Sequence, residues 1–173
     1  MNKYLLEALD AYPFDLAQAF EAMEYALSSD NQCPHTLCLY GRMYAEQLQD
    51  YPKAISYFEE ALQSNLYAIQ VYPYYINALL NYEEFEAAKK LIDFALDVKG
   101  ADKGGLLLLK ALYFEYKKEY NEALNTLKES ESFSFNQDFK NSLKEAKTRI
   151  EEKKSPQKEV NKTKKKKVTK KKS

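Results

Sequence analysis

Cys33, His35 and Cys38 are the residues whose types could carry metal or thiol chemistry, and they lie close together in the chain. A structural zinc site needs four ligands, and the sequence has no further cysteine or histidine to complete the set. Two cysteines near a helix start, five residues apart, are also poorly placed for a disulfide. We therefore expect no metal site and two reduced thiols, as in a cytosolic protein.

The remaining residues that could support catalysis do not form a recognisable set. The chain has one histidine and no glycine-rich phosphate loop, so a Ser-His-Asp arrangement or a nucleotide cradle cannot be assembled. Neighbouring carboxylates such as Glu59 and Glu60 point in different directions on a helix surface and are expected to be solvated. The sequence predicts a protein that is not an enzyme and needs no cofactor.

Charge divides the chain into an acidic body and a basic end. Residues 153–173 contain 11 lysines and one acidic residue, a net charge of +10, whereas residues 1–152 carry a net charge of −10. The basic end has few apolar residues to offset the roughly 1–2 kcal/mol per residue lost on ordering a backbone, so we expect it to be disordered. Its densest clusters are Lys164, Lys165, Lys166, Lys167, Lys170, Lys171 and Lys172.

Such a lysine-rich tail could attract phosphates without sequence preference, because lysine clusters respond to charge and not to base edges. Nonspecific nucleic-acid binding of this kind would be weak at physiological salt. Three other roles stay open at this point: a solubility tail, a tail that folds back on the acidic body, and simple neutralisation of charge.

A helical apolar stripe recurs along the acidic body. In "YPKAISYFEEAL", apolar residues fall at Tyr51, Ala54, Phe58 and Ala61, which is the spacing of one buried helix face. The pattern appears four times, and its leading alanines are separated by 35, 34 and 35 residues. They are Ala19, Ala54, Ala88 and Ala123. A period near 34 residues built from helix pairs is typical of tetratricopeptide (TPR) repeats.

The segments that precede these stripes support the resemblance. "LCLYGRMY" has Gly41 and "LLLKALYF" has Ala111 where a small residue would let the two helices of a repeat approach closely. The chain departs from the family pattern in having no tryptophan and in having Ile76 at the small position of its third unit. Pro73 should also kink that unit's first helix or delay its start. The chain thus resembles the TPR family over roughly residues 1–131.

The resemblance implies an all-α fold, an α-solenoid of TPR-like helix pairs with a concave groove, and a scaffold function in binding another protein or peptide. We expect the four units at about residues 2–29, 35–64, 66–98 and 106–132. After them, Phe139, Leu143, Ala146 and Ile150 form one apolar stripe in a charged helix, as expected of the helix that caps a solenoid. The predicted domains are a repeat domain at residues 1–153 and a disordered lysine-rich tail at residues 154–173.

The start of the chain and its hydropathy bear on location. No run approaches the ~20 apolar residues that a membrane span requires. The start also lacks the basic and apolar regions of a secretory signal. We expect a cytoplasmic protein without a membrane partner.

In the TPR family the groove is lined by the first helix of each unit, and the resemblance therefore implies a set of partner-binding residues. The set is Leu39, Arg42, Tyr74, Asn77, Asn81, Leu108, Leu109, Leu112 and Tyr116, with Cys38 and Glu46 next to the first two. This mixture would suit an apolar or mixed helix or strand. A clamp for acidic chaperone tails is not expected, because the fourth unit has leucines where further cations would be needed.

Alternatives stay open for several groove positions. The leucines of the fourth unit could be core residues or could contact the capping helix, since apolar side chains are mostly interior. Arg42 could be solvated or paired within the chain instead of serving as a ligand anchor.

Overall fold

The structure is a computed structural model that describes residues 2–134 and 136–169, with side chains up to Ser155. The chain divides into two compact units, which are larger than the four repeat units expected from the sequence. They are Met1–Asp102, called unit 1 from here on, and Lys103–Ser173, called unit 2. All regular secondary structure in the described residues is helical, which confirms the all-α prediction. The division into a repeat domain and a tail at residues 153 and 154 stays a prediction.

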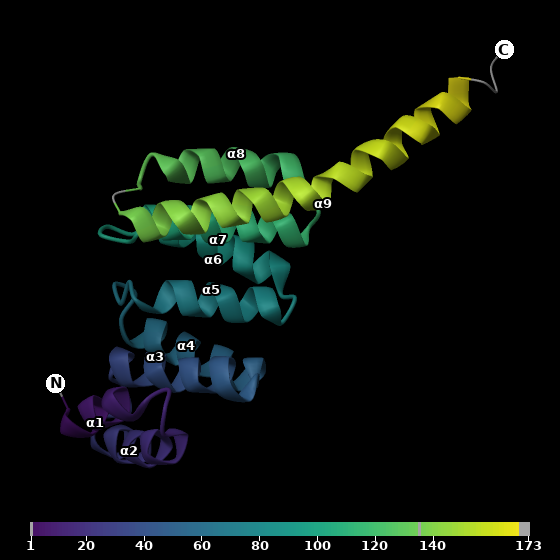
Figure 1. Ribbon diagram of the computed structural model, residues 1–173. Helices are drawn as coiled ribbons and strands as arrows, with labels where there is room; N and C mark the ends of the chain where they lie inside the picture. Colours follow the sequence, from purple (N-terminus) through teal and green to yellow (C-terminus); the bar gives the residue numbers. More distant parts are fainter. Residues whose placement is uncertain (1, 135, 170–173) are drawn as a thin grey trace. The chain divides into compact units, whose positions relative to one another are not determined.

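Unit 1 consists of consecutive helix pairs (Figure 1). In each pair the two helices lie side by side, α1 with α2, α3 with α4, and α5 with α6. Their bounds are α1 (Lys3–Ala11), α2 (Leu16–Ser29), α3 (Pro34–Met43), α4 (Tyr51–Ser64), α5 (Val71–Asn81) and α6 (Phe85–Asp97), and a short π-helical segment, Tyr44–Leu48, follows α3. In unit 2, α7 (Lys103–Tyr116) pairs with α8 (Tyr120–Glu131), and α9 (Gln137–Thr169) follows.

The second helix of each pair repeats the same pattern of burial. Helices α2, α4, α6 and α8 carry the four leading alanines of the predicted stripes, and each of these alanines is 0% exposed. They are Ala19, Ala54, Ala88 and Ala123. Because an alanine side chain ends at Cβ, its burial allows the backbones of packed helices to lie close together. The repeat predicted from alanine spacing is therefore confirmed as a repeat of helix pairs.

Local sequence explains where the helices begin and turn. Asp15 precedes α2 and Asp50 precedes α4, and each side-chain carboxylate accepts a hydrogen bond from a first-turn backbone N–H, at 3.0 and 3.2 Å. Within three of the pairs, the turn contains one residue in the left-handed region: Gln49, Glu83 or Lys118, with φ between 53° and 62°. The repeat therefore includes the turn geometry as well as the helices.

Gly41 on α3 performs the role that its position predicts. A Cβ placed on Gly41 would lie 2.6 Å from Cε1 of Phe58, a fully buried residue of α4. No side chain larger than hydrogen fits at that distance without movement of the ring. In unit 2, Ala111 is buried at the corresponding position, in a core cluster with Ala123 and Leu127 of α8.

Pro73 was expected to kink α5 or to delay its start, and its position in the first turn agrees with the second of these. The helix begins at Val71, so that Pro73 lies in the first turn, where a backbone N–H would have no intrahelical partner in any case. The preceding loop is held by the Tyr72 hydroxyl, which donates a hydrogen bond of 2.6 Å to the carbonyl of Leu66.

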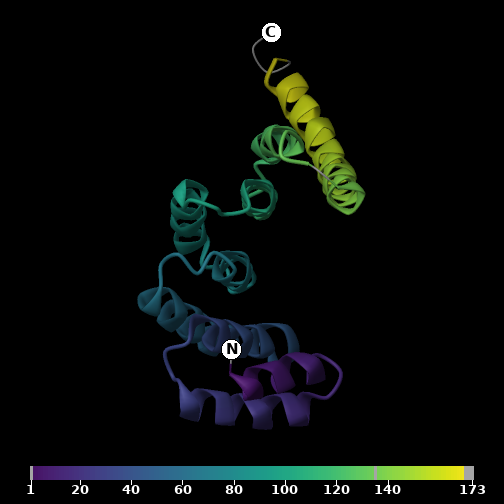
Figure 2. The same cartoon turned by 90° about the vertical axis from the view of Figure 1, so that its left-hand side faces the viewer.

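Helix α9 caps unit 2 and continues beyond the predicted boundary. Leu143, Ala146 and Ile150 are buried in the core cluster of unit 2, which confirms the predicted capping stripe. The bounds of α9 reach Thr169 (Figures 1 and 2), and its side chains are described only as far as Ser155. The predicted disorder of residues 154–173 stays a prediction.

Candidate functional site

A pocket of about 400 Å³ lies on unit 1 between the first helices of its second and third repeats. We call it the Arg42 pocket. It brings together four of the predicted groove residues from α3 and α5. Its lining residues are Arg42, Ala45, Glu46, Gln49, Tyr51, Phe58, Tyr74, Asn77, Ala78 and Asn81.

The guanidinium of Arg42 is held between two aromatic rings. Its central carbon lies 4.3 Å from the ring centroid of Tyr74 and 5.3 Å from that of Tyr12. Its Nε donates a hydrogen bond of 3.2 Å to Oε1 of Glu46, one helical turn further along. Its two terminal nitrogens have no hydrogen-bond partner among the described residues. The group is thus fixed in place while its best donors stay available to a ligand.

Electrostatics favour the charged form of this arginine. Burial alone would lower the pKa of Arg42, but the hydrogen bond and charge of Glu46 outweigh it and raise the pKa above its ordinary value. The Tyr12 hydroxyl donates a hydrogen bond to Oε2 of the same carboxylate. Burial, followed by that contact, raises the pKa of Tyr12, so the phenol stays protonated as a donor. Glu46 therefore connects the end of α1 to Arg42.

On α5, Tyr74, Asn77 and Asn81 present the other side of the pocket. Asn81 Nδ2 donates a hydrogen bond of 2.9 Å to the backbone carbonyl of Asn77. The side-chain amide of Asn77 has no partner among the described residues. The pocket thus offers an amide and a guanidinium that could both pair with a bound peptide backbone or carboxylate. That these residues bind a partner stays a prediction.

Leu39 and Cys38 do not belong to the pocket surface. Leu39 is 3% exposed and packs in the core cluster that α1, α2 and α3 share, so its prediction as a groove residue is wrong. Cys38 is also buried, with its sulfur 4.0 Å from the carbonyl of Gln70, and burial raises the pKa of its thiol to about 12. Leu39 faces the first repeat, whereas Cys38 faces Gln70, which directly precedes α5.

The structure leaves Cys33 and Cys38 as free thiols. In the part of the chain that the structure describes, no group of three or more His, Cys, Asp or Glu side chains is arranged to hold a metal ion. Within the same residues, no helix combines the length and apolarity needed to cross a membrane.

The predicted leucines of the fourth repeat face α9 across a pocket. Leu108, Leu109 and Leu112 line a separate pocket of about 260 Å³ in unit 2, and its other wall comes from α9. The three leucines are half-buried and face the capping helix across this pocket, and their role in binding a partner stays a prediction. Tyr116, at the end of α7, is 43% exposed and does not line that pocket.

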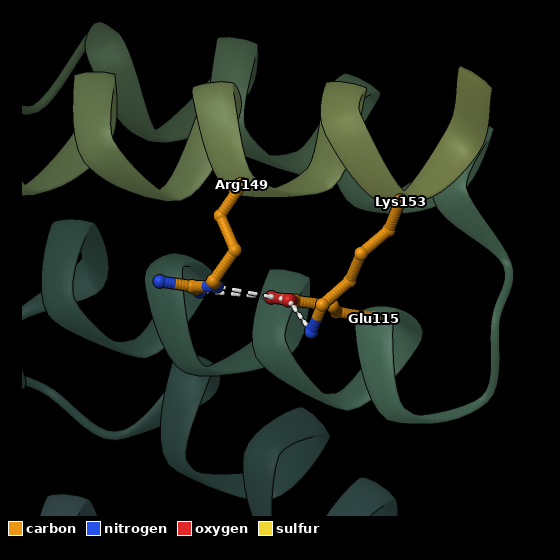
Figure 3. A network of polar contacts seen from close by, with 3 residues as sticks. All are labelled: Glu115, Arg149 and Lys153. Carbon is orange, nitrogen blue, oxygen red and sulfur yellow. Dashed lines mark hydrogen bonds and ion pairs between the residues drawn. The ribbon is translucent and has the colours of Figure 1, made fainter. Parts of the chain in front are cut away.

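An ion-pair network fixes α9 to α7, and the sequence did not indicate it. Glu115 on α7 has a side chain only 3% exposed, and it accepts hydrogen bonds of 2.9 and 2.8 Å from Arg149 and one of 2.7 Å from Lys153 (Figure 3). Burial alone would raise the pKa of Glu115, but the two cations outweigh burial and lower it. The partners are more than thirty residues apart in sequence, so no local pattern could reveal the contact.

Some of the predicted tail lysines lie within the bounds of α9, and the others lie outside the described residues. Lys164, Lys165, Lys166 and Lys167 fall within the bounds of α9, beyond the part of it whose side chains are described. Lys170, Lys171 and Lys172 lie outside the described residues.

Comparison with known proteins places the fold. No protein-family model matches the chain, and no curated protein matches it. Similar solved structures include the APC/C hetero-tetramer Cut9-Hcn1, at 21% identity and a TM-score of 0.69 over 83% of this chain and 29% of that chain. Others are PilF of Pseudomonas aeruginosa, at 18% identity and a TM-score of 0.66 over 85% of this chain and 71% of that one, and MamA, at 14% identity and a TM-score of 0.64 over 92% and 98%.

The chain thus spans less than a third of the Cut9-Hcn1 chain that it resembles. The three neighbours are TPR-containing proteins. At these identities the likeness concerns the fold, and it confirms the α-solenoid class that the alanine period predicted: the chain has a TPR-type helical-repeat fold.

Proposed function

We propose that the chain is a non-enzymatic scaffold that holds a segment of another protein in the Arg42 pocket. The observation that carries the proposal is the guanidinium of Arg42, positioned by two aromatic rings and Glu46, with both terminal nitrogens unpaired in the described structure. A bound carbonyl or carboxylate would complete those donors. Because the group is already held in place, little side-chain entropy would be lost when a partner binds.

The rest of the pocket supports a peptide ligand of mixed character. Asn77 could donate to and accept from a peptide bond, since a free amide has both functions. The ring of Tyr74 supplies an apolar wall on the same side. One of the similar structures is a hetero-tetramer of Cut9 and Hcn1, so at least one protein of this fold assembles with another protein.

A peptide selection on the full chain can test the proposal. Random peptides would be selected for binding, and the affinity of the best labelled peptides would be measured by fluorescence anisotropy. Arg42→Ala and Asn77→Ala should each weaken binding by about tenfold or more, the scale expected of a central contact. The matched controls are Lys90→Ala and Asn121→Ala, which remove one exposed cation and one exposed amide elsewhere.

Circular dichroism would establish that each variant keeps its helices. If the selected peptides bind Arg42→Ala and Asn77→Ala as tightly as the unaltered chain, the pocket is not the binding site and the proposal fails.

A second candidate function is that of a nucleic-acid- or ribosome-associated adaptor that uses the basic end of the chain. The observation that favours it is the net charge of +10 over residues 153–173. Such a segment would deliver the repeats to phosphate-rich surfaces in a salt-dependent manner. A cytoplasmic location, as expected from the sequence, suits both candidates and is part of the proposal.

A further inference from the structure

A second pocket, of about 330 Å³, lies on unit 2 where the end of α8 meets α9. We call it the lysine pocket. Lys140, Lys144 and Lys147 line it from α9, together with Leu143. Glu131 and Ser134 line it from the end of α8 and the turn that follows. Three like charges around one concave surface repel one another.

Glu131 is the one acidic residue that lines the pocket beside them. None of the three lysines forms an ion pair within the described residues, and neither does Glu131. The contrast lies on the same helix, where Arg149 and Lys153 are both paired with Glu115. The lysine pocket therefore holds positive charge that is available to a ligand.

The hydroxyl of Ser134 gives a second, independent indication. Its oxygen is buried and has no hydrogen-bond partner in the described structure. A buried polar atom without a partner destabilises the fold, so such atoms call for an explanation in each structure. Ser134 lines the same pocket as the three lysines, and an anionic oxygen bound there would accept its hydrogen bond.

The spacing of the lysines indicates a ligand with several negative charges. Lys140, Lys144 and Lys147 occupy positions i, i+4 and i+7, so they share one face of α9 and extend over about 10 Å of its axis. Lysines serve as point charges for phosphate, whereas carboxylates are matched better by the planar fork of arginine. The lysine-rich sequence that follows on the same helix would extend the charge along the ligand.

We propose that the lysine pocket binds the phosphate backbone of a nucleic-acid strand, independently of its base sequence. A membrane surface is the less suitable partner, because a surface-bound helix needs an apolar face and that of α9 is buried: Leu143, Ala146 and Ile150 pack inside unit 2. The inference deepens the second candidate function above by naming a site in the described part of the chain. It does not depend on binding in the Arg42 pocket.

The test measures binding of a short, fluorescein-labelled single-stranded RNA of mixed sequence to the full chain at about 50 to 200 mM salt. Each phosphate contact on a single strand contributes about 0.7 to the slope of log affinity against log salt. The triple variant Lys140→Gln, Lys144→Gln, Lys147→Gln should therefore reduce the slope by about 2. If the three contacts contribute nothing at 1 M salt, a slope of about 2 corresponds to a roughly 100-fold loss of affinity at 0.1 M salt, one decade lower.

Two further substitutions examine the pocket itself. Ser134→Ala should weaken RNA binding several-fold and leave the salt slope unchanged, because it removes a neutral donor. Were Ser134 merely structural, its loss would leave affinity unaltered and would stabilise the fold by removing an unsatisfied group. Glu131→Gln should strengthen RNA binding, because it removes the one negative charge that lines the pocket.

The matched control is the triple variant Lys89→Gln, Lys90→Gln, Lys99→Gln, which makes the same change of charge at exposed positions of unit 1. It should keep the unaltered slope and affinity. A second comparison replaces Lys164, Lys165, Lys166 and Lys167 by Gln.

If those tail substitutions abolish binding and the pocket variant binds as the unaltered chain does, the inference is overturned while the adaptor function survives. Absence of RNA binding by the unaltered chain would overturn both. Binding to vesicles of anionic lipid that depends on the lysine pocket, without RNA binding, would assign the site to membranes and also overturn the inference.

Discussion

Replacement of Gly41 by alanine should destabilise unit 1 even though alanine is the better helix former. In an unobstructed helix, glycine to alanine gains about 1 kcal/mol. At Gly41 the added methyl carbon would lie 2.6 Å from Cε1 of Phe58 and 2.9 Å from its Cδ1 and Cζ. Carbon atoms in contact are ordinarily about 3.5–4.0 Å apart, so the overlap approaches 1 Å.

The ring of Phe58 has little room to yield. It is fully buried and stacks on Tyr75 of α5, with ring centroids 5.8 Å apart and planes at 29°. Overpacking of a buried site typically costs about 1–3 kcal/mol, and it can cost more where the neighbour is rigid. Because the ring is held in place, we expect the upper part of that range, about 2–3 kcal/mol, which exceeds the gain in helix propensity of about 1 kcal/mol and leaves a net loss of about 1–2 kcal/mol.

Urea unfolding followed by circular dichroism can measure this loss. For an m-value of about 2 kcal/mol/M, the midpoint of the transition that includes unit 1 should fall by about 0.5–1 M. Gly104→Ala is the matched control, since its nearest contacts would be 3.1 Å to Phe133 and 3.2 Å to Phe139. It should cost less than Gly41→Ala, because a shift of a few tenths of an ångström relieves those contacts.

A second-site change isolates the cause. In a Phe58→Leu background the ring is absent, and Gly41→Ala should then leave the free energy of unfolding unchanged or raise it. The effect of Gly41→Ala in the two backgrounds should therefore differ by about 1 kcal/mol or more, which is the coupling energy of the two positions. If Gly41→Ala is at least as stable as the unaltered chain, the close approach of α3 and α4 does not require glycine. A penalty of unchanged size in the Phe58→Leu background would also refute the proposed clash.

Three further outcomes follow from the described contacts. Arg149 and Lys153 lower the pKa of Glu115, so the carboxylate should stabilise the fold above its unfolded pKa of about 4.3, and this stabilisation should be lost as pH falls through the lower folded value. Glu115→Gln should lower the free energy of unfolding by about 1–3 kcal/mol near neutral pH. Urea titrations at several pH values should also show a weaker dependence of stability on acid for this variant. Glu83→Gly should raise the free energy of unfolding by up to about 1 kcal/mol, because Glu83 has φ of 62°, and an unchanged urea midpoint would contradict this. Burial raises the pKa of Cys38 to about 12, so iodoacetamide at about pH 8 should alkylate this thiol only after unfolding. Mass spectrometry can detect the alkylated residue. Rapid labelling of the folded chain at Cys38 would contradict the prediction, because it would show that the thiol is accessible.

The repeat could be predicted from sequence because its cause is local and recurs. An alanine that must be buried between helices, as at Ala54, cannot become larger without separating them, and the same constraint returns in each pair. Pro73 and Gly41 were predictable for a similar reason, since each acts through its own backbone or its own missing Cβ.

The pocket was only partly predictable, because its parts meet through packing. Arg42, Tyr74 and Asn77 could be placed by repeat position, whereas Tyr12 enters from the end of α1 and nothing in its sequence context indicates an arginine partner. Leu39 was predicted to line the groove but is buried, because packing of other helices again decided its surroundings. A position that lines a groove between repeats is buried where a neighbouring pair covers it, and this depends on which helices surround α3.

The polarity of the groove positions agrees with their surroundings. In unit 2 the positions on α7 are leucines, and they line a pocket whose other wall is α9. In unit 1 the corresponding positions on α3 and α5 include Arg42 and Asn77. Nε of Arg42 is paired with Glu46, whereas its terminal nitrogens and the amide of Asn77 have no partner among the described residues. An arginine placed between α7 and α9 would need a counter-charge there, and Glu115 is already paired with Arg149 and Lys153. Because one pocket offers polar donors without partners and the other is lined largely by apolar side chains, we assign protein binding to the Arg42 pocket and not to the leucines.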